Sequence, residues 1–559
     1  MDRRRRKTLP VVKTDYDIEN NNDDNDHLEE QEEPQPPIPE QPPSPPHGHW
    51  VRLSEEDDTP HLFRHSVGLE EIPGVVTTVK PLSDNTERLD SKLAIIMVGL
   101  PARGKSYIVK KLRRYLNWLQ FETRVFNVGN TRRVQKSADV EQSANFFDPD
   151  NKDMKRMRDE MAMNVLEQLI DWLKSGHKSS VAIHDATNST VERRKLLIDR
   201  LQQEPNIKIL LMESVCTDQK VLERNFRLKL LGPDYKDKDP RKALADFRSR
   251  VANYERAYVP LGDWEEYRDL QYCKMINVGK KVVAYNISGY LAGQCVFYLM
   301  NFNLSDRQIF VTRHGQSTDN VEDRIGGDAS LTPLGKKFAR ALEKFISEQR
   351  KSFAMDLTKS KYEQEKKWEA YGLDPLDLSD TMAGQTANDI IHTKAKAISA
   401  SQFTVWTSML KRSTESANDF STDDYDIKHI RYLNEINSGE RERMTYDEIK
   451  QQYPDEFKAR QENKLTYRYP GMGGESYIDV IHRLQPLIIE LERMTQSCLI
   501  ITHRVALRII LGYLLDWSRE EMPHMLVPLH TVYELRPKPY GSQLKKWKYV
   551  EEQDTFVEF

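Results

Sequence analysis

The stretch KLAIIMVGLPARGKS, Lys92 to Ser106, decides the fold of the first half of this chain. Its beginning is almost continuously apolar, as in a strand that is buried on both faces of a parallel sheet. Its end, GLPARGKS, fits the pattern G-x-x-x-x-G-K-[ST], in which backbone N–H groups wrap a polyphosphate, Lys105 reaches the outer phosphates and Ser106 ligates Mg²⁺. Apolar residues at helical spacing follow. The order strand, loop, helix predicts a phosphate-binding loop rather than a structural glycine turn.

Further strand-like runs alternate with helical patterns along both halves of the chain. The runs are SVAIHDA, IKILLMESV, KMINVGK and QCVFYLMNF in the first half, and RQIFVTRHG, FTVWTSM and SCLIITHR in the second. Such alternation is typical of α/β folds with a parallel sheet, and 559 residues are too many for one ordinary core. We predict two α/β domains, at 91–303 and 304–545, with an insertion at 349–401 and tails at 1–90 and 546–559.

The first 90 residues have the composition of a disordered segment. Residues 15–33 hold ten acidic side chains and no Lys or Arg, and residues 34–46 are mostly proline. Neither stretch can bury enough apolar surface to offset the entropy lost on ordering. The basic cluster at 3–7 is expected to be a solvated charge run rather than a nuclear address. Thr8 and Ser44 are candidate phosphorylation sites, because exposed flexible segments suit protein kinases.

The bulk composition excludes several classes of protein. A net charge of -4 argues against a general nucleic-acid binder. The four cysteines are scattered without a C-x-x-C pair, which predicts neither a disulfide framework nor a zinc knuckle. No apolar run approaches the roughly 20 residues of a membrane span, and the N-terminus lacks the apolar segment of a secretory signal. We therefore expect a cytoplasmic protein without nucleic-acid or membrane partners.

Two further features of the first half suit phosphoryl transfer. Asp185 ends a strand-like run, where a carboxylate can hold Mg²⁺ or orient an accepting hydroxyl, although an Asp there is as often a helix cap. Arg132 and Arg133 supply paired guanidiniums suited to a sugar phosphate. Surface arginines are usually just solvated, so only the phosphate-binding loop supports this role for the pair.

Two histidines in the second half stand in matched settings. His314 and His503 each follow an apolar run, in IFVTRH and CLIITH, and the carboxyl ends of parallel strands meet at one edge of a sheet. Arg313 and Arg412 could neutralise a phosphate there, and no third residue shows a zinc-ligand spacing. A single strand-end histidine is usually a core residue. The pair, with one member in R-H-G, instead predicts that His314 is a nucleophile toward phosphorus.

Over residues 92–545 the sequence resembles the 6-phosphofructo-2-kinase/fructose-2,6-bisphosphatase family. The motifs that carry the resemblance occur in the family's order: IMVGLPARGKSYI, RYLNW, FFDPDN, DATN, PDY, YLMN, RHG, RIGGD, VWTS, LNEI, MTYDEI, GESY and PLHTVYEL. The resemblance implies a P-loop kinase with a mainly parallel sheet, followed by a histidine phosphatase of the phosphoglycerate-mutase type. It also implies ATP, Mg²⁺, fructose 6-phosphate and fructose 2,6-bisphosphate as ligands. A homodimer and protein kinases acting on the tail are further partners that it leaves open.

The resemblance implies roles for single residues. ATP is bound by Gly99, Leu100, Pro101, Ala102, Arg103, Gly104, Lys105 and Ser106, and Mg²⁺ by Ser106 and Asp185. The catalytic residues of the kinase are Lys105, Asp185 and Lys229, and its sugar phosphate is bound by Arg132, Arg133, Arg158, Arg250 and Tyr254. The catalytic residues of the phosphatase are His314 as the phosphorylated nucleophile, His503 as its partner and Glu435 as the proton donor. The substrate-binding residues of the phosphatase are Arg313, Asn320, Arg324, Gly326, Arg412, Tyr467 and Arg468.

Several positions depart from the family's pattern. Thr131 and His184 replace a tyrosine and a phenylalanine in the first half, and Gln316 and Arg504 replace a glutamate and a glutamine beside the two histidines. Thr466 and a Gly/Met stretch stand where the family places an arginine and a lysine on the sugar bisphosphate. Three hypotheses remain: a bifunctional enzyme, a regulatory binding protein with one or both activities lapsed, and a histidine phosphatase for another ester. The retained catalytic candidates favour an enzyme.

Overall fold

The structure is a computed structural model that describes residues 75–79, 92–134, 144–176, 179–232, 234–235, 238–373, 386–538 and 541–559. All of these residues belong to one compact unit that begins at Leu69. The expectations for the basic, acidic and proline-rich parts of the N-terminal segment, including Thr8 and Ser44, fall outside the described residues.

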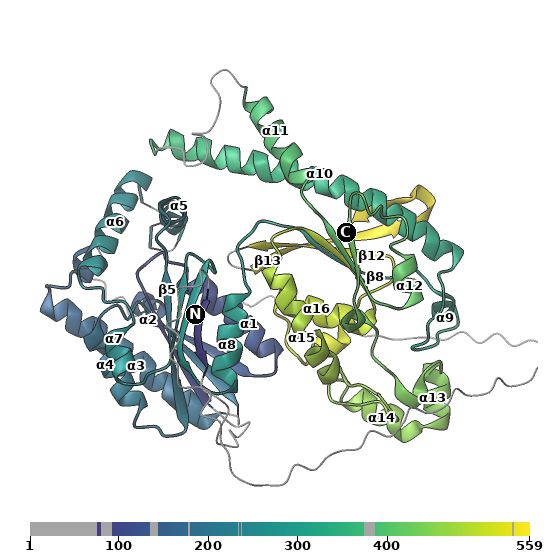
Figure 1. Cartoon of the computed structure of the whole chain (residues 1–559), viewed down its shortest axis with the longest axis horizontal. Helices are drawn as coiled ribbons and strands as arrows, with labels where there is room; N and C mark the ends of the chain where they lie inside the picture. The colour runs from purple at the N-terminus through teal and green to yellow at the C-terminus, as the bar shows by residue number, and fades with distance from the viewer. Residues whose placement is uncertain are drawn as a thin grey trace, which may run out of the picture. The chain divides into compact units, whose positions relative to one another are not determined.

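The first half is built around a seven-stranded sheet with the order β1-β7-β6-β5-β2-β4-β3 (Figure 1). Among the described strands of this sheet, β6 and β7 pair antiparallel and the other neighbours pair in parallel. The strands are β1 Val75–Val79, β2 Lys92–Val98, β3 Glu122–Asn127, β4 Ser180–Asp185, β5 Ile207–Val215, β6 Tyr272–Ile276 and β7 Lys281–Ile287. The predicted α/β fold with a mainly parallel sheet is confirmed. The apolar run from Lys92 to Val98 forms β2, between β5 and β4.

Alternate residues of β2 face two different helical layers. Leu93, Ile95 and Met97 pack with α1 and α8, whereas Ala94 and Ile96 pack with α3 and α4. The helices of this half are α1 Lys105–Trp118, α2 Val128–Val134, η1 Ala144–Phe147, α3 Lys152–Ser175, α4 Val191–Leu201, α5 Gln219–Leu230, α6 Pro240–Arg256, α7 Asp263–Tyr267 and α8 Tyr290–Met300. The strand expected from QCVFYLMNF is wrong, because this run lies largely in α8. A short run that is apolar on all sides suits a buried helix as well as a buried strand.

The segment predicted as a tail at 1–90 contributes a strand to this sheet. β1 pairs in parallel with β7, with Val75 opposite Val282 and Val76 opposite Val283. Valine and threonine, which make up all of β1, favour extended backbone. Composition over a long window does not reveal such a short edge strand, because its backbone hydrogen bonds are made to a partner distant in sequence.

The second half is built around another seven-stranded sheet, with the order β10-β9-β11-β8-β12-β13-β14. The first four of these strands pair in parallel, and β12, β13 and β14 continue the sheet antiparallel. The strands are β8 Ile309–Arg313, β9 Thr404–Thr407, β10 Asp426–His429, β11 Cys498–Thr502, β12 Thr531–Lys538, β13 Gly541–Val550 and β14 Thr555–Glu558. A parallel core extended by antiparallel strands confirms the α/β class predicted for this half.

The helices of the second half connect the strands of this sheet. They are α9 Thr318–Val321, α10 Pro333–Ala370, α11 Ala387–Ser399, α12 Lys411–Glu415, α13 Tyr446–Gln452, α14 Pro454–Glu462, α15 Tyr477–Arg493 and α16 Arg504–Leu515. Single 3₁₀ turns are η2 Arg431–Leu433, η3 Gly439–Arg441, η4 Met522–His524 and η5 Glu551–Gln553. The stretch 349–401, predicted as an insertion, holds the C-terminal part of α10 and all of α11.

The last residues of the chain are part of the sheet and not the tail expected at 546–559. β13 continues to Val550, and β14 pairs with it in antiparallel fashion, with Phe556 opposite Tyr549. The ring of Phe556 is buried, 4.5 Å from the ring of Phe345 in α10. One face of β13 is exposed to water, so its sequence is rich in lysine. It therefore lacks the continuous apolar run by which the buried strands were predicted.

A buried group of charges joins helices of the two halves. Glu492 of α15 accepts hydrogen bonds from Lys111 Nζ at 2.8 Å and Arg114 Nη2 at 2.7 Å, both on α1. The hydroxyl of Tyr513 donates to the same carboxylate at 2.6 Å. Burial alone would raise the pKa of Glu492, but Lys111 and Arg114 outweigh burial and hold this pKa at about 2. The carboxylate is therefore ionised and fully paired at neutral pH.

Replacing Glu492 with glutamine is expected to lower the stability of the protein by roughly 3–5 kcal/mol, because it leaves Lys111 and Arg114 buried without a negative partner. Chemical denaturation should show the loss as a lower midpoint. The matched control is Glu490→Gln, since Glu490 lies on the same helix and forms a half-exposed pair with Arg493. That control should change stability by less than about 1 kcal/mol. Equal midpoints for the two variants would contradict a structural role for the buried group.

Candidate active sites

The loop between β2 and α1 is a phosphate cradle shaped by its glycines. Gly99 has a φ of 127°, and a Cβ at this position would lie 2.6 Å from the carbonyl oxygen of Ser214. Gly104 has a φ of 89° and immediately precedes α1. The ammonium group of Lys105 donates to the carbonyl oxygens of Gly99 at 2.7 Å and Leu100 at 2.6 Å. Burial lowers the pKa of Lys105 to about 7, so an arriving polyanion would stabilise its charged form.

Asp185 lies at the end of β4, directly beside this loop. Its Oδ2 accepts hydrogen bonds from Ser106 Oγ at 3.3 Å and Asn127 Nδ2 at 2.5 Å. The cap of the next helix, α4, is Thr190, so Asp185 is not a helix cap. Burial raises the pKa of Asp185, and Lys105 opposes that rise. The adjacent hydroxyl and carboxylate fit Mg²⁺, a hard cation that prefers oxygen ligands and also coordinates substrate phosphates. Asn127 was missed by the sequence analysis.

The arginines predicted to bind a sugar phosphate surround one carboxylate, Asp234. Arg132 lies 2.9 Å from it, Arg250 3.5 Å and Arg133 3.6 Å. The guanidinium of Arg250 also lies 3.9 Å from the centre of the Phe147 ring. Three positive charges on one carboxylate leave an excess of positive charge, which suits a phosphate. Asp234 and Phe147 were also missed by the sequence analysis, because neither belongs to a recognisable spacing with the arginines.

The other candidates of the first half lie around the same cavity of about 1780 Å³. Lys229, Arg158 and Tyr254 line it together with Lys105, Ser106, Asp185 and the three arginines. Burial lowers the pKa of Lys229, and Arg250 lowers it further. Arg158 donates to the carbonyl oxygen of Phe146. The structure thus brings the predicted catalytic and sugar-phosphate residues of this half to a single cavity.

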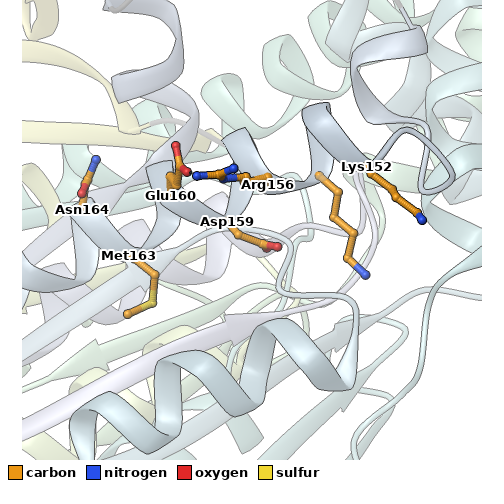
Figure 2. Close-up of a pocket in the computed structure, with 7 residues that line it drawn as sticks. Lys152, Arg156, Asp159, Glu160, Met163 and Asn164 are labelled. Carbon is orange, nitrogen blue, oxygen red and sulfur yellow. Dashed lines mark hydrogen bonds and ion pairs between the residues drawn. The ribbon is translucent and has the colours of Figure 1, made fainter.

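The first half has another hollow, along α3, which Figure 2 shows. It is lined by Lys152, Lys155, Arg156, Asp159, Glu160, Met163 and Asn164, all from this one helix. Arg156 and Glu160 in it form an exposed ion pair one helical turn apart. The hollow contains none of the predicted catalytic residues and lies on a single solvated helix face.

His184, where the family has phenylalanine, is a structural core residue. It is completely buried, and its Nε2 lies 3.1 Å from the carbonyl oxygen of Ala162. The side-chain amide of Asn188 donates to the other ring nitrogen at 3.2 Å. Burial lowers the pKa of His184 to about 4, so the ring is neutral at pH 7. This departure therefore adds a hydrogen-bonded side chain to the core without adding a charge near the cavity.

In the second half, β8 and β11 bring His314 and His503 together. The two strands pair in parallel with Arg313 opposite Thr502, and the centres of the two histidine rings are 5.0 Å apart. Nδ1 of His314 donates to the carbonyl oxygen of Gly315 at 2.6 Å, while Nε2 accepts from Arg412 Nε at 3.2 Å. Burial holds the pKa of His314 well below its usual range, and Arg412 and Arg313 depress it further. Nε2 is therefore an unprotonated nitrogen with a lone pair available for phosphorus.

Polar groups around the two histidines have unfilled hydrogen-bonding capacity. His503 Nε2 lies 2.7 Å from the hydroxyl of Ser408, while its Nδ1 is buried without a partner among the described residues. Nε of Arg313 is likewise buried and unpartnered within the described part of the chain. Burial lowers the pKa of Arg313 to about 9, helped by the charge of Arg504. An anion at this site would satisfy these donors, which is the setting required for a phosphate.

Glu435 follows the 3₁₀ turn η2, and its carboxyl group contacts the first backbone N–H groups of α16, which begins directly after His503. One of its carboxylate oxygens accepts from the backbone N–H groups of Ile436 at 3.0 Å and Val505 at 3.1 Å, and the other accepts from Arg504 N at 2.9 Å. These three hydrogen bonds hold the carboxyl group of Glu435 close to His503, which follows the end of β11. The structure thus brings together His314, His503, Glu435, Arg313 and Arg412, as the sequence analysis expected.

A basic cluster beside this site was missed by the sequence analysis. It consists of Arg460, Lys464, Arg504 and Arg508. Burial lowers the pKa of Lys464, and the charges of the other three lower it further. Arg460 donates to the hydroxyl of Tyr446 at 2.9 Å, and Arg508 to that of Tyr477 at 2.9 Å. Arg504 and Arg508 also act on Arg313, so the cluster borders the histidines. Arg504 and Arg508 lie one turn apart on α16, and this i, i+4 spacing is the signal that could have revealed that part of the cluster.

Other predicted substrate-binding residues have partners of their own. Asn320 accepts from Ser317 N at 3.1 Å in the cap of α9. Arg324 donates to Glu322 and to the carbonyl oxygen of Arg443, both at 2.8 Å. Gly326 has a φ of 72°, and a Cβ there would clash with Glu442.

Tyr467 and Arg468 contact carboxylates instead of the histidines. The hydroxyl of Tyr467 lies 3.5 Å from Glu456. Arg468 pairs with Asp479 at 2.5 Å, and its side chain is 63% exposed. Among the basic side chains of this region, the cluster of Arg460, Lys464, Arg504 and Arg508 is therefore better placed for a substrate than Arg468.

Two departures from the family's pattern also have structural explanations. The side-chain oxygen of Gln316 accepts from Thr332 at 2.9 Å, and its backbone N–H donates to His530. The side chain of Thr466 is exposed, and its backbone N–H donates to the side-chain oxygen of Asn463. Neither side chain contacts the histidines, so neither change removes a group from their immediate surroundings.

Among the described residues, no helix combines the length and apolar character needed to cross a membrane.

Comparison with known families gives two matches. The 6-phosphofructo-2-kinase family matches residues 82–306, and the histidine phosphatase superfamily (branch 1) matches residues 381–550. A Schizosaccharomyces pombe protein described as a probable 6-phosphofructo-2-kinase is 48% identical over 501 residues, covering 88% of this chain and 75% of that protein. The human 6-phosphofructo-2-kinase/fructose-2,6-bisphosphatase 3 is 38% identical, covering 83% and 78%. The fructose-2,6-bisphosphatase of Saccharomyces cerevisiae is also 38% identical, covering 82% and 89%.

Proposed function

This chain belongs to the 6-phosphofructo-2-kinase/fructose-2,6-bisphosphatase family, and we propose that it both makes and hydrolyses fructose 2,6-bisphosphate. The observation that carries the proposal is that one chain holds two separate phosphoryl-transfer sites. The first is the loop with Lys105, Ser106 and Asp185, and the second is the pair His314 and His503 with Arg412. The kinase half corresponds to 91–303 with the edge strand β1, and the phosphatase half to 304–545 with the rest of β13 and with β14.

The kinase half transfers the γ-phosphate of ATP to the 2-hydroxyl of fructose 6-phosphate. The loop from Gly99 to Ser106 binds the ATP phosphates through backbone N–H groups, and Lys105 leaves its loop carbonyls to bind the outer phosphates. Mg²⁺, held by Ser106 and Asp185, supplies charge neutralisation on the phosphates. Asp185 is also placed to orient the attacking hydroxyl. Lys229 faces Asp185 across the cavity and stabilises charge on the transferring group.

The sugar phosphate binds where the positive charges gather. Arg132, Arg133 and Arg250 exchange part of their contact with Asp234 for the 6-phosphate of the sugar. Arg158 and Tyr254 line the same cavity and complete the site.

The phosphatase half transfers the 2-phosphate first to itself and then to water. Nε2 of His314 attacks phosphorus, the bond from phosphorus to the sugar 2-oxygen breaks, and Arg313 and Arg412 neutralise the transferring group. Glu435 donates a proton to the departing sugar oxygen. Water then attacks phosphorus and gives its proton to the Glu435 carboxylate, and cleavage of the phosphorus–nitrogen bond releases phosphate and restores His314, while His503 binds the phosphoryl oxygens. Arg460, Lys464 and Arg508 bind the second phosphate of the substrate.

The proposal includes ATP as cosubstrate, Mg²⁺ as cofactor and the cytoplasm as compartment. The four cysteines, Cys216, Cys273, Cys295 and Cys498, are buried and unpaired, which suits a reducing environment. The proposal also includes two protein partners. One is a second copy of this chain, with which it forms a homodimer, and the other is a protein kinase that phosphorylates the N-terminal segment.

The decisive experiment follows both reactions with the purified full-length chain. Incubation with ATP, Mg²⁺ and fructose 6-phosphate should produce fructose 2,6-bisphosphate, and incubation with fructose 2,6-bisphosphate alone should release phosphate and fructose 6-phosphate. Failure of both reactions, with binding of the bisphosphate retained, would favour the regulatory binding protein. Failure of the second reaction alone, with turnover of another sugar phosphate, would favour a phosphatase for a different ester.

A further inference from the structure

The long helix α10 of the phosphatase half ends in a core cluster of the kinase half. Trp368, in the last turn of α10, is 5% exposed. It belongs to a buried cluster whose other members all come from the kinase half: Ala102, Leu230, Tyr235, Ala243, Leu244, Phe247 and Val251. A tryptophan from one half therefore fills an apolar pocket of the other half.

Polar contacts hold the same end of α10 in place. Arg241 at the beginning of α6 donates to the carbonyl oxygen of Tyr371 at 2.6 Å. Arg227 of α5 lies 3.6 Å from Glu365 of α10, and the two side chains are only 4% and 11% exposed. Gly372 has a φ of 68°, and a Cβ there would lie 1.7 Å from the guanidinium of Arg241. The segment 365–373 is thus fitted to α5 and α6 by shape as well as by charge.

The elements that this segment contacts carry the sugar-phosphate site. Lys229 lies in α5, and Arg250 and Tyr254 lie in α6. Ala102, a member of the Trp368 cluster, belongs to the phosphate-binding loop, and Asn225 of α5 donates to its carbonyl oxygen at 2.9 Å. Trp368 itself does not line the cavity that holds Lys105 and Asp185. Its influence on the sugar-phosphate site must therefore pass through α5 and α6.

We propose that residues 365–373 of the phosphatase half form a brace that positions α5 and α6 of the kinase half for sugar-phosphate binding, with Trp368 as the central positioning residue. The inference rests on the proposed kinase activity. Without the indole, the cluster loses its largest side chain, and α5 and α6 lose a rigid support. Lys229 and Arg250 then no longer sit at the spacing that the substrate requires, and small displacements of such groups are costly.

The test is the steady-state kinetics of Trp368→Ala in the full-length chain. We expect the KM for fructose 6-phosphate to rise about 10-fold, the KM for ATP to change less than about 3-fold, and phosphatase turnover to equal that of the wild type. Trp368→Phe should restore most of the affinity for fructose 6-phosphate, because a phenyl ring fills much of the same space. The matched control is Glu369→Ala, an exposed neighbour on the same helix, which should behave as the wild type.

The outcomes separate the brace from the kinase assignment. If the wild type makes no fructose 2,6-bisphosphate, the proposed function fails. If the wild type is active and Trp368→Ala has the same KM for fructose 6-phosphate, the brace is overturned. An equal rise in both KM values would also overturn it, because a brace on the sugar site predicts a selective effect. If Trp368→Ala loses phosphatase activity as well, Glu365→Gln decides. A rise of about 3-fold in the KM for fructose 6-phosphate supports the brace, and an unchanged KM overturns it.

Discussion

Replacing His314 with alanine should abolish both the covalent phosphoenzyme and the phosphatase turnover, with a loss of at least about 10³-fold in rate. In the wild type, brief incubation with fructose 2,6-bisphosphate labelled with ³²P at the 2-phosphate should trap a phosphoenzyme that is stable in alkali and labile in acid, as phosphoramidates are. The reason is geometric: Nδ1 of His314 is committed to Gly315, which leaves Nε2 as the unprotonated nitrogen beside Arg412. The measurement is the label retained by the protein, compared with the phosphate released.

The pH dependence of label formation tests the same assignment independently. An ordinary imidazole has a pKa of about 6.5 and would be mostly protonated at pH 5.5. Burial and the two neighbouring arginines hold the pKa of His314 well below that value, so the neutral form persists as the pH falls. Label formation should therefore show no loss attributable to His314 between about pH 7 and pH 5.5.

The matched control for this experiment is His482→Ala, because His482 is an exposed histidine of the same half. It should retain wild-type labelling and turnover. Label that persists in the His314→Ala protein would place the phosphate on another residue and remove His314 from the mechanism. His503→Ala should be slow, but its remaining label should still sit on His314, because Nε2 of His314 does not depend on His503 for its lone pair.

Replacing Lys105 with methionine should reduce the rate of fructose 2,6-bisphosphate synthesis by about 10²–10³-fold, the usual effect of removing one electrostatic contact to a transferring group. Methionine preserves the length and much of the volume of lysine, so the packing of the loop should survive. Phosphatase turnover should stay at the wild-type level, since His314 and His503 belong to the other sheet. Coupled measurement of both activities on one preparation checks the prediction.

The control is Lys195→Met, which removes an exposed lysine from α4 in the same half. This variant should retain both activities. If Lys105→Met kept the wild-type rate of synthesis, Lys105 would not bind the transferring phosphate, and the loop from Gly99 to Ser106 would need another role. If it lost both activities, the loss would reflect the fold instead of the chemistry.

Much of the fold and of both sites could be predicted from the sequence because the decisive signals are local. The apolar run 92–98 and the phosphate-binding loop 99–106 follow each other directly in the sequence. Their backbone conformations depend only on residues of one strand, one turn and one helix. His314 and His503 could be paired because each ends a buried run, and parallel strands present their carboxyl ends at one edge. In the same way, the sequence predicts that Asp185 lies at a strand end. It does not distinguish a helix-capping Asp185 from a metal-binding one.

Only the tertiary structure decided the rest, because contacts between distant segments leave no periodic trace in the sequence. The hydrogen bond from Ser106 places Asp185 beside the phosphate-binding loop, and Thr190 instead of Asp185 caps α4. The basic cluster of Arg460, Lys464, Arg504 and Arg508 forms where residues 460–464 approach α16, and the spacing within each segment does not show that the two segments meet. Trp368 reads as one apolar residue in a charged helix. Trp368 is buried against α5 and α6 because the two halves of the chain pack together. The sequence of each half predicts the fold of that half but not how the two halves meet.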